Sequence, residues 1–368
     1  MDLESRLALI TRAPTEEVVT HEELRALLQK QENPIAYNGW EPSGLVHLGT
    51  GLMCAYKMRD FIDAGVRFKA YLSTWHAWLN NKLGGDMEAI KKAAQHFKHA
   101  WIACGVPEDK VEFVLSEALY DDITYWEKVI KVAKELTVAR TVRTLEIAGR
   151  GEDSEEGRKV AELLYTPMQV ADIFHLNIEL CQLGTDQRKA NMVAREVGEK
   201  LGFWKPVCVH HHLLQGLAKP PQWPLPADAT ERKQVLSSVK MSKSKPDTCI
   251  YIYDEPAEIK RKLGNAFCPE RELDFNPVMD IAKHIVFRER EASGIIIERP
   301  AKFGGNLELQ NFEELANAYR EGKLHPMDLK NSVASELTLI LEPVRDYFVK
   351  NKEAHETLKF MQSRKITR

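Results

Sequence analysis

Two segments far apart in the chain hold residues that could act on phosphate groups. In the first, PSGLVHLGTG at residues 42–51, a histidine and several glycines come just before an apolar helical stretch. A glycine-flanked loop that passes from a strand into a helix is where open α/β sheets bind phosphates. We expect Gly49 to let a phosphate or a base approach the backbone, and His47 to hold a proton-donating ring beside it. The alternative is a tight turn whose histidine is satisfied within its own loop.

The second segment is KMSKS, residues 240–244, in which Lys240 and Lys243 flank Met-Ser. Movable ammonium groups suit a pyrophosphate that must be held only as charge moves onto it. By itself the segment could be an exposed basic turn. Because both segments occur in this order, at opposite ends of a predicted α/β domain, together they predict chemistry on a nucleotide.

A third candidate is LLYTPMQVADIF, residues 163–174, which carries polar groups on a predicted helix. Thr166 is the predicted N-cap, and Pro167 suits the first helical position. Gln169 and Asp172 then share one helix face because they are three residues apart, with Tyr165 at the helix mouth on the same side. Either these groups line a pocket or they are a solvated amide and a surface carboxylate.

The elements that must position these residues follow a strand–helix–strand pattern. Strands are predicted at residues 33–40, 67–75, 110–119, 179–185 and 205–214, and a helix at 47–65. Thr20 and Glu23 form a capping box that predicts a helix before the first strand. The repeat predicts an α/β fold with a doubly wound, parallel, Rossmann-like sheet. Beyond about residue 254 the pattern becomes helical.

We therefore expect a catalytic α/β domain at residues 1–246 and a smaller all-helical domain at 247–368. Residues 218–238 contain four prolines and no periodicity, which predicts a long, mobile loop or insertion. With 368 residues, of which 44% are hydrophobic, the chain is long enough for two such domains. No apolar run is long enough to predict a membrane span, and the acidic N-terminus does not resemble a signal peptide, so we expect a cytoplasmic protein.

Charge and cysteine content restrict the partners. The net charge of −3 means that any nucleic-acid surface must be local, with residues 186–195 and the basic tail at 349–368 as candidates. The tail is better explained as a solvated helix face. The six cysteines are widely separated, which indicates reduced thiols rather than a zinc site. Cys208, His210 and His212 alternate along a predicted strand, and we attribute them to packing rather than to metal binding.

The two phosphate-binding segments resemble the signatures of class I aminoacyl-tRNA synthetases. The segments between and after them are similar to the tyrosyl-tRNA synthetase family of archaeal and eukaryotic type, from about Tyr37 to the LHPMDLKNSVASELTLILEP stretch. The resemblance implies that L-tyrosine is activated with ATP, which brings Mg²⁺, and is then transferred to tRNA(Tyr). No protein-bound structural metal is expected. It also implies a helical anticodon-binding domain and a homodimer, for which residues 122–136 are the candidate interface helix.

The resemblance assigns roles to residues that match the family pattern. The tyrosine-binding residues would be Tyr37, Tyr165, Gln169, Asp172 and Gln187. Asp172 would accept the substrate phenol proton and Tyr37 would donate to the phenol oxygen, so bound phenylalanine would leave both groups unpaired. This family is itself the known example of such selection. The ATP-binding residues would be Gly39, Gly49, Thr50, Gly184, Asp186 and Lys243, with Gly184 and Asp186 on the ribose side. The catalytic residues would be His47, Lys240 and Lys243.

On the tRNA side, the resemblance places Arg143, Arg188 and Lys189 at the acceptor end. Phe303 would stack on the first anticodon base, and Asp328 would accept a hydrogen bond from it. The alternative for the three basic residues is helix-surface charge. The alternative for Asp328 is stabilisation of the helix dipole in the first turn of a helix.

The sequence departs from the family pattern at two places. Thr50 stands where a second signature histidine is common, which predicts slower activation. Ser73-Thr74 stands where an Ala-Asp dipeptide is usual, although His76 and Asn80 fit, so local pocket contacts should differ. Three alternative functions are a tryptophan-specific synthetase, a small-molecule nucleotidyltransferase and an inactive tRNA-binding paralogue. The Tyr37/Asp172 pair argues against the first, and the lysine loop argues against the other two.

Overall fold

The computed structural model describes residues 1–148, 159–243 and 245–364, and within these ranges the side chains of Glu146, Ala229, Thr230, Lys233, Ser237 and Phe303 are not described. The chain divides into two compact units. We call Met1–Gly44, Tyr56–His212 and Phe360–Arg368 the sheet unit, and Leu45–Ala55 with Leu213–Lys359 the helical unit. Both units are discontinuous in sequence. The domain boundary expected between residues 246 and 247 stays a prediction.

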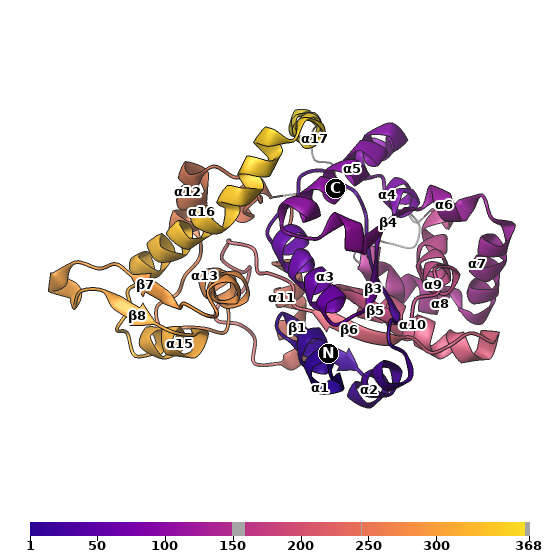
Figure 1. Ribbon diagram of the computed structural model, residues 1–368, viewed down its shortest axis with the longest axis horizontal. Helices are drawn as coiled ribbons and strands as arrows, with labels where there is room; N and C mark the ends of the chain where they lie inside the picture. The colour runs from indigo at the N-terminus through magenta and orange to yellow at the C-terminus, as the bar shows by residue number, and fades with distance from the viewer. Residues whose placement is uncertain (149–158, 244, 365–368) are drawn as a thin grey trace. The chain divides into compact units, whose positions relative to one another are not determined.

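The sheet unit is built on six strands in the order β1-β6-β5-β2-β3-β4 (Figure 1). Their bounds are β1 Thr15–Val19, β2 Ile35–Trp40, β3 Arg67–Leu72, β4 Val111–Leu115, β5 Leu180–Gly184 and β6 Val207–His211. Strands β2 to β6 pair in parallel, which confirms the doubly wound α/β fold. All five predicted strands are present. Those predicted at 67–75 and 110–119 end earlier, because α4 begins at Thr74 and α6 at Glu117.

β1 is the strand that the sequence analysis missed. It lies at the edge of the sheet and pairs antiparallel with β6. The sheet is therefore mixed, whereas the sequence analysis predicted a parallel sheet. Its sequence is TEEVV, and none of its residues is fully buried. An edge strand is covered on fewer sides than a central strand, so it does not need a run of apolar residues. Two acidic residues instead contact histidines at the end of β6: Glu17 bonds His210 Nδ1 at 2.7 Å, and Glu16 bonds Nδ1 of His212, the residue after β6, at 2.5 Å.

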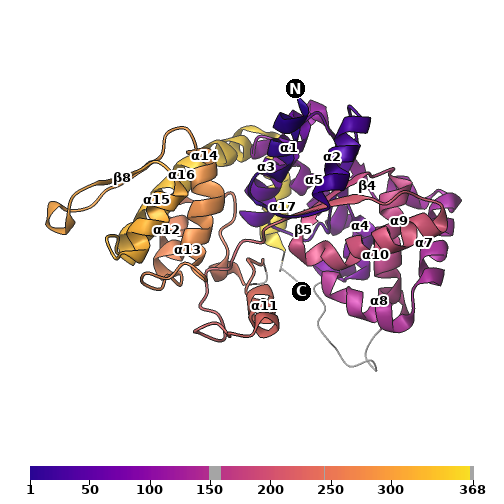
Figure 2. The ribbon, with the colours of Figure 1, turned by 90° about the horizontal axis from the view of Figure 1, so that it is seen from below.

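Helices connect the strands of the sheet unit. Their bounds are α1 Leu3–Thr11, α2 His21–Lys30, α3 Cys54–Asp63, α4 Thr74–Leu79, α5 Met87–Ala103, α6 Glu117–Tyr120, α7 Ile123–Glu135, α8 Val138–Thr144, α9 Tyr165–His175 and α10 Arg188–Gly198. The capping box of Thr20 and Glu23 is present at the start of α2, as predicted. In both views α7, α8, α9 and α10 lie together (Figures 1 and 2), and α9 contacts both α7 and α10.

The helical unit contains α11 Ala229–Ser238, α12 Pro256–Asn265, α13 Pro277–Ile281, α14 Phe287–Glu289, α15 Phe312–Arg320 and α16 Pro326–Lys350, while α17 Lys352–Ser363 crosses into the sheet unit. α16 packs against α12 and α13 (Figure 2). The unit also has a two-stranded antiparallel sheet, β7 Ile295–Ile297 and β8 Leu307–Leu309, which the all-helical prediction omitted. The loop predicted at 218–238 is also wrong in its second half, because 229–238 has no proline and forms α11.

The order of strands creates a switch point in the sheet. β2 pairs with β3 on one side and with β5 on the other, so the chain leaves the carboxyl ends of β2 and β5 in opposite directions. Open α/β sheets bind ligands at such a point. None of the helices in the described ranges is both apolar enough and long enough to cross a membrane.

Candidate active site

The pocket expected to bind an amino-acid side chain begins at β2. Tyr37 lies in the middle of this strand and is 1% exposed. Two residues on, Gly39 packs against aromatic rings: a Cβ there would lie 3.4 Å from the ring of Tyr37 and 3.4 Å from the ring of Tyr71 on β3. Gly39 therefore makes room for the rings that border the pocket.

Asp172 is carried by α9 and is 1% exposed. Its Oδ1 accepts hydrogen bonds from the hydroxyl of Tyr125 at 2.9 Å and from that of Tyr71 at 3.2 Å. Burial raises the pKa of this carboxyl to about 8, and the two phenol bonds act in the opposite direction. A carboxyl group this deeply buried is not the surface carboxylate that was the alternative.

Two buried polar atoms next to Asp172 have no partner among the described residues, the hydroxyl of Tyr37 and Nε2 of His76. His76 Nε2 lies 3.8 Å from Oδ2 of Asp172, beyond hydrogen-bond distance. Burial lowers the pKa of His76 to about 4, so the ring is neutral at neutral pH. Buried polar atoms without a partner are rare, and two such atoms beside a buried carboxyl group indicate the place of a polar ligand group.

The unusual Ser73-Thr74 dipeptide takes part in this arrangement. The Ser73 hydroxyl bonds His76 Nδ1 at 2.6 Å and so fixes the orientation of the ring. The Thr74 hydroxyl donates to Glu117 Oε2 at 2.9 Å. Both residues of the dipeptide thus make side-chain contacts here, and His76 lies 3.8 Å from Asp172.

The predicted start of α9 is wrong. α9 begins at Tyr165 with Leu164 as N-cap, and Thr166 does not cap it. The reason is that a 3₁₀ helix, η6 Val160–Leu164, runs directly into α9 and leaves no open helix start. The Thr166 hydroxyl instead bonds that of Thr144 at 2.7 Å.

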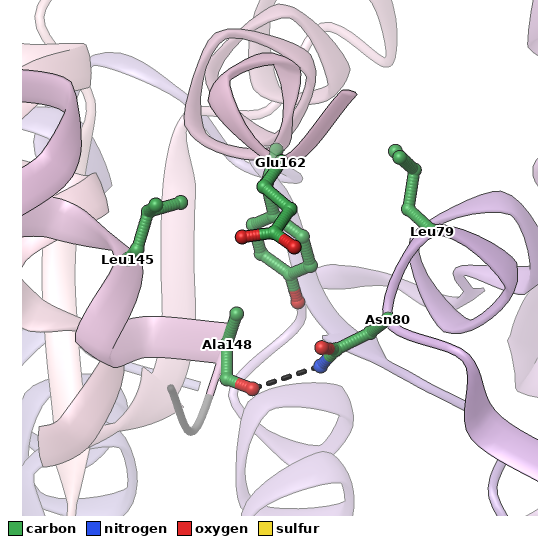
Figure 3. A pocket seen from close by; sticks show the side chains of 6 residues that line it. Leu79, Asn80, Leu145, Ala148 and Glu162 are labelled. Carbon is green, nitrogen blue, oxygen red and sulfur yellow. Dashed lines mark hydrogen bonds between the residues drawn. The ribbon is translucent and has the colours of Figure 1, made fainter. Parts of the chain in front are cut away.

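A second group of polar side chains surrounds the hydroxyl of Tyr165, which donates to Glu41 at 2.7 Å. Asn80 donates to the same carboxylate at 3.0 Å and to the carbonyl of Ala148 at 2.8 Å (Figure 3). The pocket here is lined by Leu79, Asn80, Leu145, Ala148, Glu162 and Tyr165. Acidic side chains at such a place suit an ammonium group. Glu41 and Glu162 were missed by the sequence analysis because neither belongs to a recognisable motif.

Gln169 and Gln187 are brought together by α9 and by the turn after β5. Gln169 Nε2 donates to Gln187 Oε1 at 3.2 Å, and Gln187 Nε2 donates to the carbonyl of Ile147 at 3.0 Å. Gly184 ends β5, and half-buried Asp186 lies in the next turn, η7 Thr185–Gln187. These residues follow β5, one of the two strands at the switch point.

The loop that is expected to bind phosphate belongs to the helical unit. His47 is buried, and its Nδ1 accepts a hydrogen bond from the backbone N–H of Gly49 at 3.1 Å. The proton of the neutral ring must therefore be on Nε2. Burial and the positive charges of Lys243 and Lys240 lower the pKa of His47 to about 3. His47 is thus a neutral donor. Thr50 bonds the backbone of His47 at 3.3 Å, in the manner of a local cap.

Glycine is needed in this loop for packing. A Cβ on Gly49 would lie 3.2 Å from the ring of His47, so this glycine makes room for the histidine. A Cβ on Gly51 would lie 2.6 Å from Ile252. The loop passes into a single π-helical turn, η1 Gly49–Met53, and then into α3, as the predicted helix at 47–65 requires.

The lysine segment is attached to residues 214–217 by its backbone. Met241 N–H donates to the carbonyl of Leu214 at 2.6 Å, and Gly216 N–H donates to that of Val239 at 2.7 Å. Lys240 and Lys243 are partly exposed and raise the positive potential at His47. The structure therefore brings both signature segments into one unit, as their joint interpretation requires.

Of the residues expected on the tRNA side, Arg143 on α8 and Lys189 on α10 are exposed and adjacent: Lys189 Nζ donates to the carbonyl of Arg143 at 3.2 Å. Arg188 is paired with Glu17, its Nε lying 2.9 Å from both carboxylate oxygens. Asp328 lies in the first turn of α16, as its helix-dipole alternative predicts. The side chain of Phe303 lies outside the described residues.

His210, one of three residues considered for a metal, has both ring nitrogens in hydrogen bonds. Nδ1 bonds Glu17, and Nε2 lies 2.9 Å from the amide nitrogen of Asn191. Cys208 is fully buried on the same strand. These contacts are those of packing and strand pairing.

Comparison with known proteins identifies the class. The family of tRNA synthetases class I (W and Y) matches residues 29–342. A tyrosine–tRNA ligase from Thermococcus sibiricus is 46% identical over 376 residues, which cover 98% of this chain and 99% of the relative. The chain belongs to this class I synthetase family and, within it, to the tyrosine–tRNA ligases.

Solved structures agree with this assignment. The crystal structure of tyrosyl-tRNA synthetase from Pyrococcus horikoshii, complexed with L-tyrosine, has a TM-score of 0.92 at 44% identity and covers 99% of this chain and 100% of that one. That from Aeropyrum pernix has a TM-score of 0.86 at 37% identity, with 99% and 100% covered. A synthetase of this family is an ATP-dependent ligase.

Proposed function

We propose that this chain joins L-tyrosine to tRNA(Tyr) in two steps, activation by ATP and transfer. The observation that carries the proposal is the buried Asp172 carboxyl with the unpaired Tyr37 hydroxyl beside it. A substrate phenol can donate to the first group and accept from the second. Phenylalanine would leave both unpaired, and buried unpaired polar groups are unfavourable. An indole N–H has no acceptor function, so tryptophan could satisfy Asp172 but not Tyr37.

The rest of the amino acid is bound by the second polar group. Glu41 has two hydrogen bonds from Tyr165 and Asn80 and lies 3.4 Å from Lys82, and these contacts hold its carboxylate in place. We assign the substrate ammonium to the side chains of Tyr165, Gln169 and Gln187, with the negative potential of Glu41 as support. The substrate carboxylate is already ionised at neutral pH and needs no general base to attack the α-phosphorus of ATP.

ATP enters as its magnesium complex, and the chain supplies placement and charge stabilisation. We assign Gly184 and Asp186 to the ribose side, and Gly39, Gly49 and Thr50 to close approach of the nucleotide. His47 donates its Nε2–H to a phosphate oxygen, and Lys240 and Lys243 neutralise the leaving pyrophosphate. Because His47 stays neutral, it adds a hydrogen bond without adding a further charge next to the two lysines. The 3′-terminal hydroxyl of the tRNA then attacks the tyrosyl-adenylate carbonyl.

We assign Arg143, Arg188 and Lys189 to the acceptor end of the tRNA. Arg188 must then exchange its partner Glu17 for a phosphate or a base edge. The anticodon roles of Phe303 and Asp328 rest on the family pattern alone.

We also propose a homodimer with α7 as part of its interface. Ile123 is 71% exposed and Ile130 is 56% exposed on this helix, and exposed apolar side chains of this size favour an interface. A cytoplasmic location fits the six cysteines, all of which are free thiols.

The test is transfer of a labelled amino acid to tRNA. The purified chain is incubated with ATP, magnesium, total tRNA from an archaeon, and one of tyrosine, tryptophan or phenylalanine. The proposal expects acid-precipitable label with tyrosine, on a tRNA whose anticodon reads tyrosine codons. Label with tryptophan in place of tyrosine would contradict it, as would an absence of label with all three.

A further inference from the structure

Asp172 is held by two hydroxyl groups that no motif identifies. Tyr125 comes from α7 and Tyr71 from β3, and both donate to the same carboxylate oxygen, Oδ1, at 2.9 and 3.2 Å. All three residues are at most 1% exposed. Tyr71 is held in turn by Ser116, whose Oγ lies 3.1 Å from its hydroxyl.

The other carboxylate oxygen of Asp172 has a different environment. Oδ2 lies 3.8 Å from His76 Nε2, and that nitrogen has no hydrogen-bond partner among the described residues. The hydroxyl of Tyr37 also has none there. The hydrogen bonds to the Asp172 carboxylate are thus divided unequally. Oδ1 accepts two, and among the described residues no group donates to Oδ2.

This division has a geometric consequence. A carboxyl group can rotate about its last side-chain bond and present either oxygen, because that torsion is broad. Two hydrogen bonds from different elements to Oδ1 restrict the rotation and leave Oδ2 on the side of the unpaired His76 Nε2. A binding group fixed in this way loses less freedom when the ligand arrives.

We propose that Tyr71 and Tyr125 are positioning residues for tyrosine selection, whose hydroxyls hold Oδ1 of Asp172 so that Oδ2 accepts the substrate phenol. The inference rests on the proposed function and adds to it two residues that do not touch the reacting atoms. Their hydroxyls act on the amino acid only through Asp172.

The two bonds also act on the charge of Asp172, because a phenol that donates to a carboxylate favours its ionised form. Only the ionised form can accept at both oxygens. The titratable groups that face Asp172 come from five elements: Tyr37 of β2, Tyr71 of β3, His76 of α4, Tyr120 of α6, and Tyr125 of α7, with Tyr165 on α9 itself. Burial holds the tyrosines and His76 neutral at neutral pH, so Asp172 is the group that titrates. Without the hydroxyl of Tyr125, the pKa of Asp172 rises further.

The test uses Tyr71→Phe, Tyr125→Phe and the double variant, which keep the rings and remove only the hydroxyls. Tyr319→Phe is the matched control, because this buried tyrosine belongs to the helical unit and donates to the carbonyl of Pro269 at 2.9 Å. For each protein, KM and kcat are measured by ATP–pyrophosphate exchange with tyrosine and with phenylalanine, from pH 6 to pH 9.

We expect each single variant to raise KM for tyrosine by about tenfold, the usual scale for one hydrogen bond near a charged group. KM for phenylalanine should not rise, so the ratio of kcat/KM for the two amino acids falls. In the wild type, KM for tyrosine should fall as rising pH ionises Asp172. In Tyr125→Phe, this fall should occur at higher pH, because the pKa of Asp172 is raised. The control should match the wild type in each respect.

Equal losses for tyrosine and phenylalanine, or an unchanged pH profile, would mean that the two hydroxyls have a structural role alone. Circular dichroism shows whether each variant is folded. If folded variants prefer tyrosine over phenylalanine as strongly as the wild type does, the inference is overturned. If the wild type itself gives no tyrosine-dependent exchange, the proposed function fails. This outcome differs from failure of the positioning role, in which the wild type is active and the variants keep its preference.

Discussion

Asp172 shows at the scale of one residue how binding and stability can oppose each other. The carboxyl group has a pKa of 3.8 in an unfolded chain, and burial raises it to about 8 in the folded protein. Between these two values the folded state binds more protons than the unfolded state. The free energy of unfolding therefore decreases as pH rises through this window.

Asp172→Asn should remove this pH dependence, because an amide does not ionise. We expect the variant to have a higher Tm than the wild type at pH 8, and the difference to shrink as pH falls towards 5. Differential scanning calorimetry across this range measures it. Asp346→Asn, at an exposed position on α16, is the control. A constant difference in Tm from pH 5 to pH 8 would contradict the raised pKa.

Most of the candidate site residues could be named from the sequence because motifs carry them, and their roles stay predictions. His47, the two lysines, Tyr37 and Asp172 lie in recognisable segments, and the structure shows each segment in a setting compatible with its role. Glu41, Tyr71 and Tyr125 were not predictable. Each reaches its partner through contacts between residues far apart in the sequence, and a tyrosine on a strand or helix is by default a packing residue.

At the scale of the element, the proposed phosphate-binding loop, residues 42–51, depends on close packing with residues 250–253. Leu48 N–H donates to the carbonyl of Ile250 at 3.0 Å, and Ile252 N–H donates to that of Val46 at 3.1 Å. A Cβ on Gly51 would lie 2.6 Å from Ile252 Cγ2 and 3.2 Å from Val46 Cγ1. The segment before the helix is thus fixed against a strand-like partner that lies far along the chain.

Gly51→Ala should therefore destabilise the loop by about 1–3 kcal/mol, the usual range for overpacking, and should raise KM for ATP. The double variant Gly51→Ala/Ile252→Ala should lose less free energy of unfolding than the sum of the two single variants. Urea denaturation and exchange kinetics measure these quantities. Gly264→Ala, where an added Cβ meets nothing within 4 Å, is the control. Additive losses would show that the contact is not tight.

The elements that the sequence predicts well are those with a strong apolar pattern. The five parallel strands carry buried apolar residues, and all were found. β1 was missed because it is a half-buried edge strand with two glutamates, and α11 because four prolines nearby suggested a loop throughout. The β7–β8 pair is short, only three residues for each strand, and such pairs have little periodicity to detect.

At the scale of the molecule, a chain with a net charge of −3 must bind a polyanion through a local surface. Lys189 and Arg143 are exposed and adjacent on α10 and α8, which makes them the best-placed cations of the proposed acceptor surface. The division into two units and the proposed dimer are properties of this scale that no single motif specifies.

Lys189→Ala should raise KM for tRNA severalfold and reduce the slope of log KM against log salt by about one, because one phosphate contact is lost. Aminoacylation at several salt concentrations measures both. Lys350→Ala removes an exposed lysine from α16 and is the control. If Lys189→Ala keeps the wild-type salt slope, the acceptor surface lies elsewhere.

The central claim is that this chain activates tyrosine and selects it through Asp172. The most direct measurement is ATP–pyrophosphate exchange with tyrosine, tryptophan or phenylalanine, on the wild type and on Asp172→Ala. We predict that the wild type exchanges far more efficiently with tyrosine than with the other two amino acids, and that the variant loses the exchange with tyrosine. Exchange with none of the three amino acids would contradict the enzymatic assignment. Undiminished tyrosine exchange by Asp172→Ala would contradict the proposed selection.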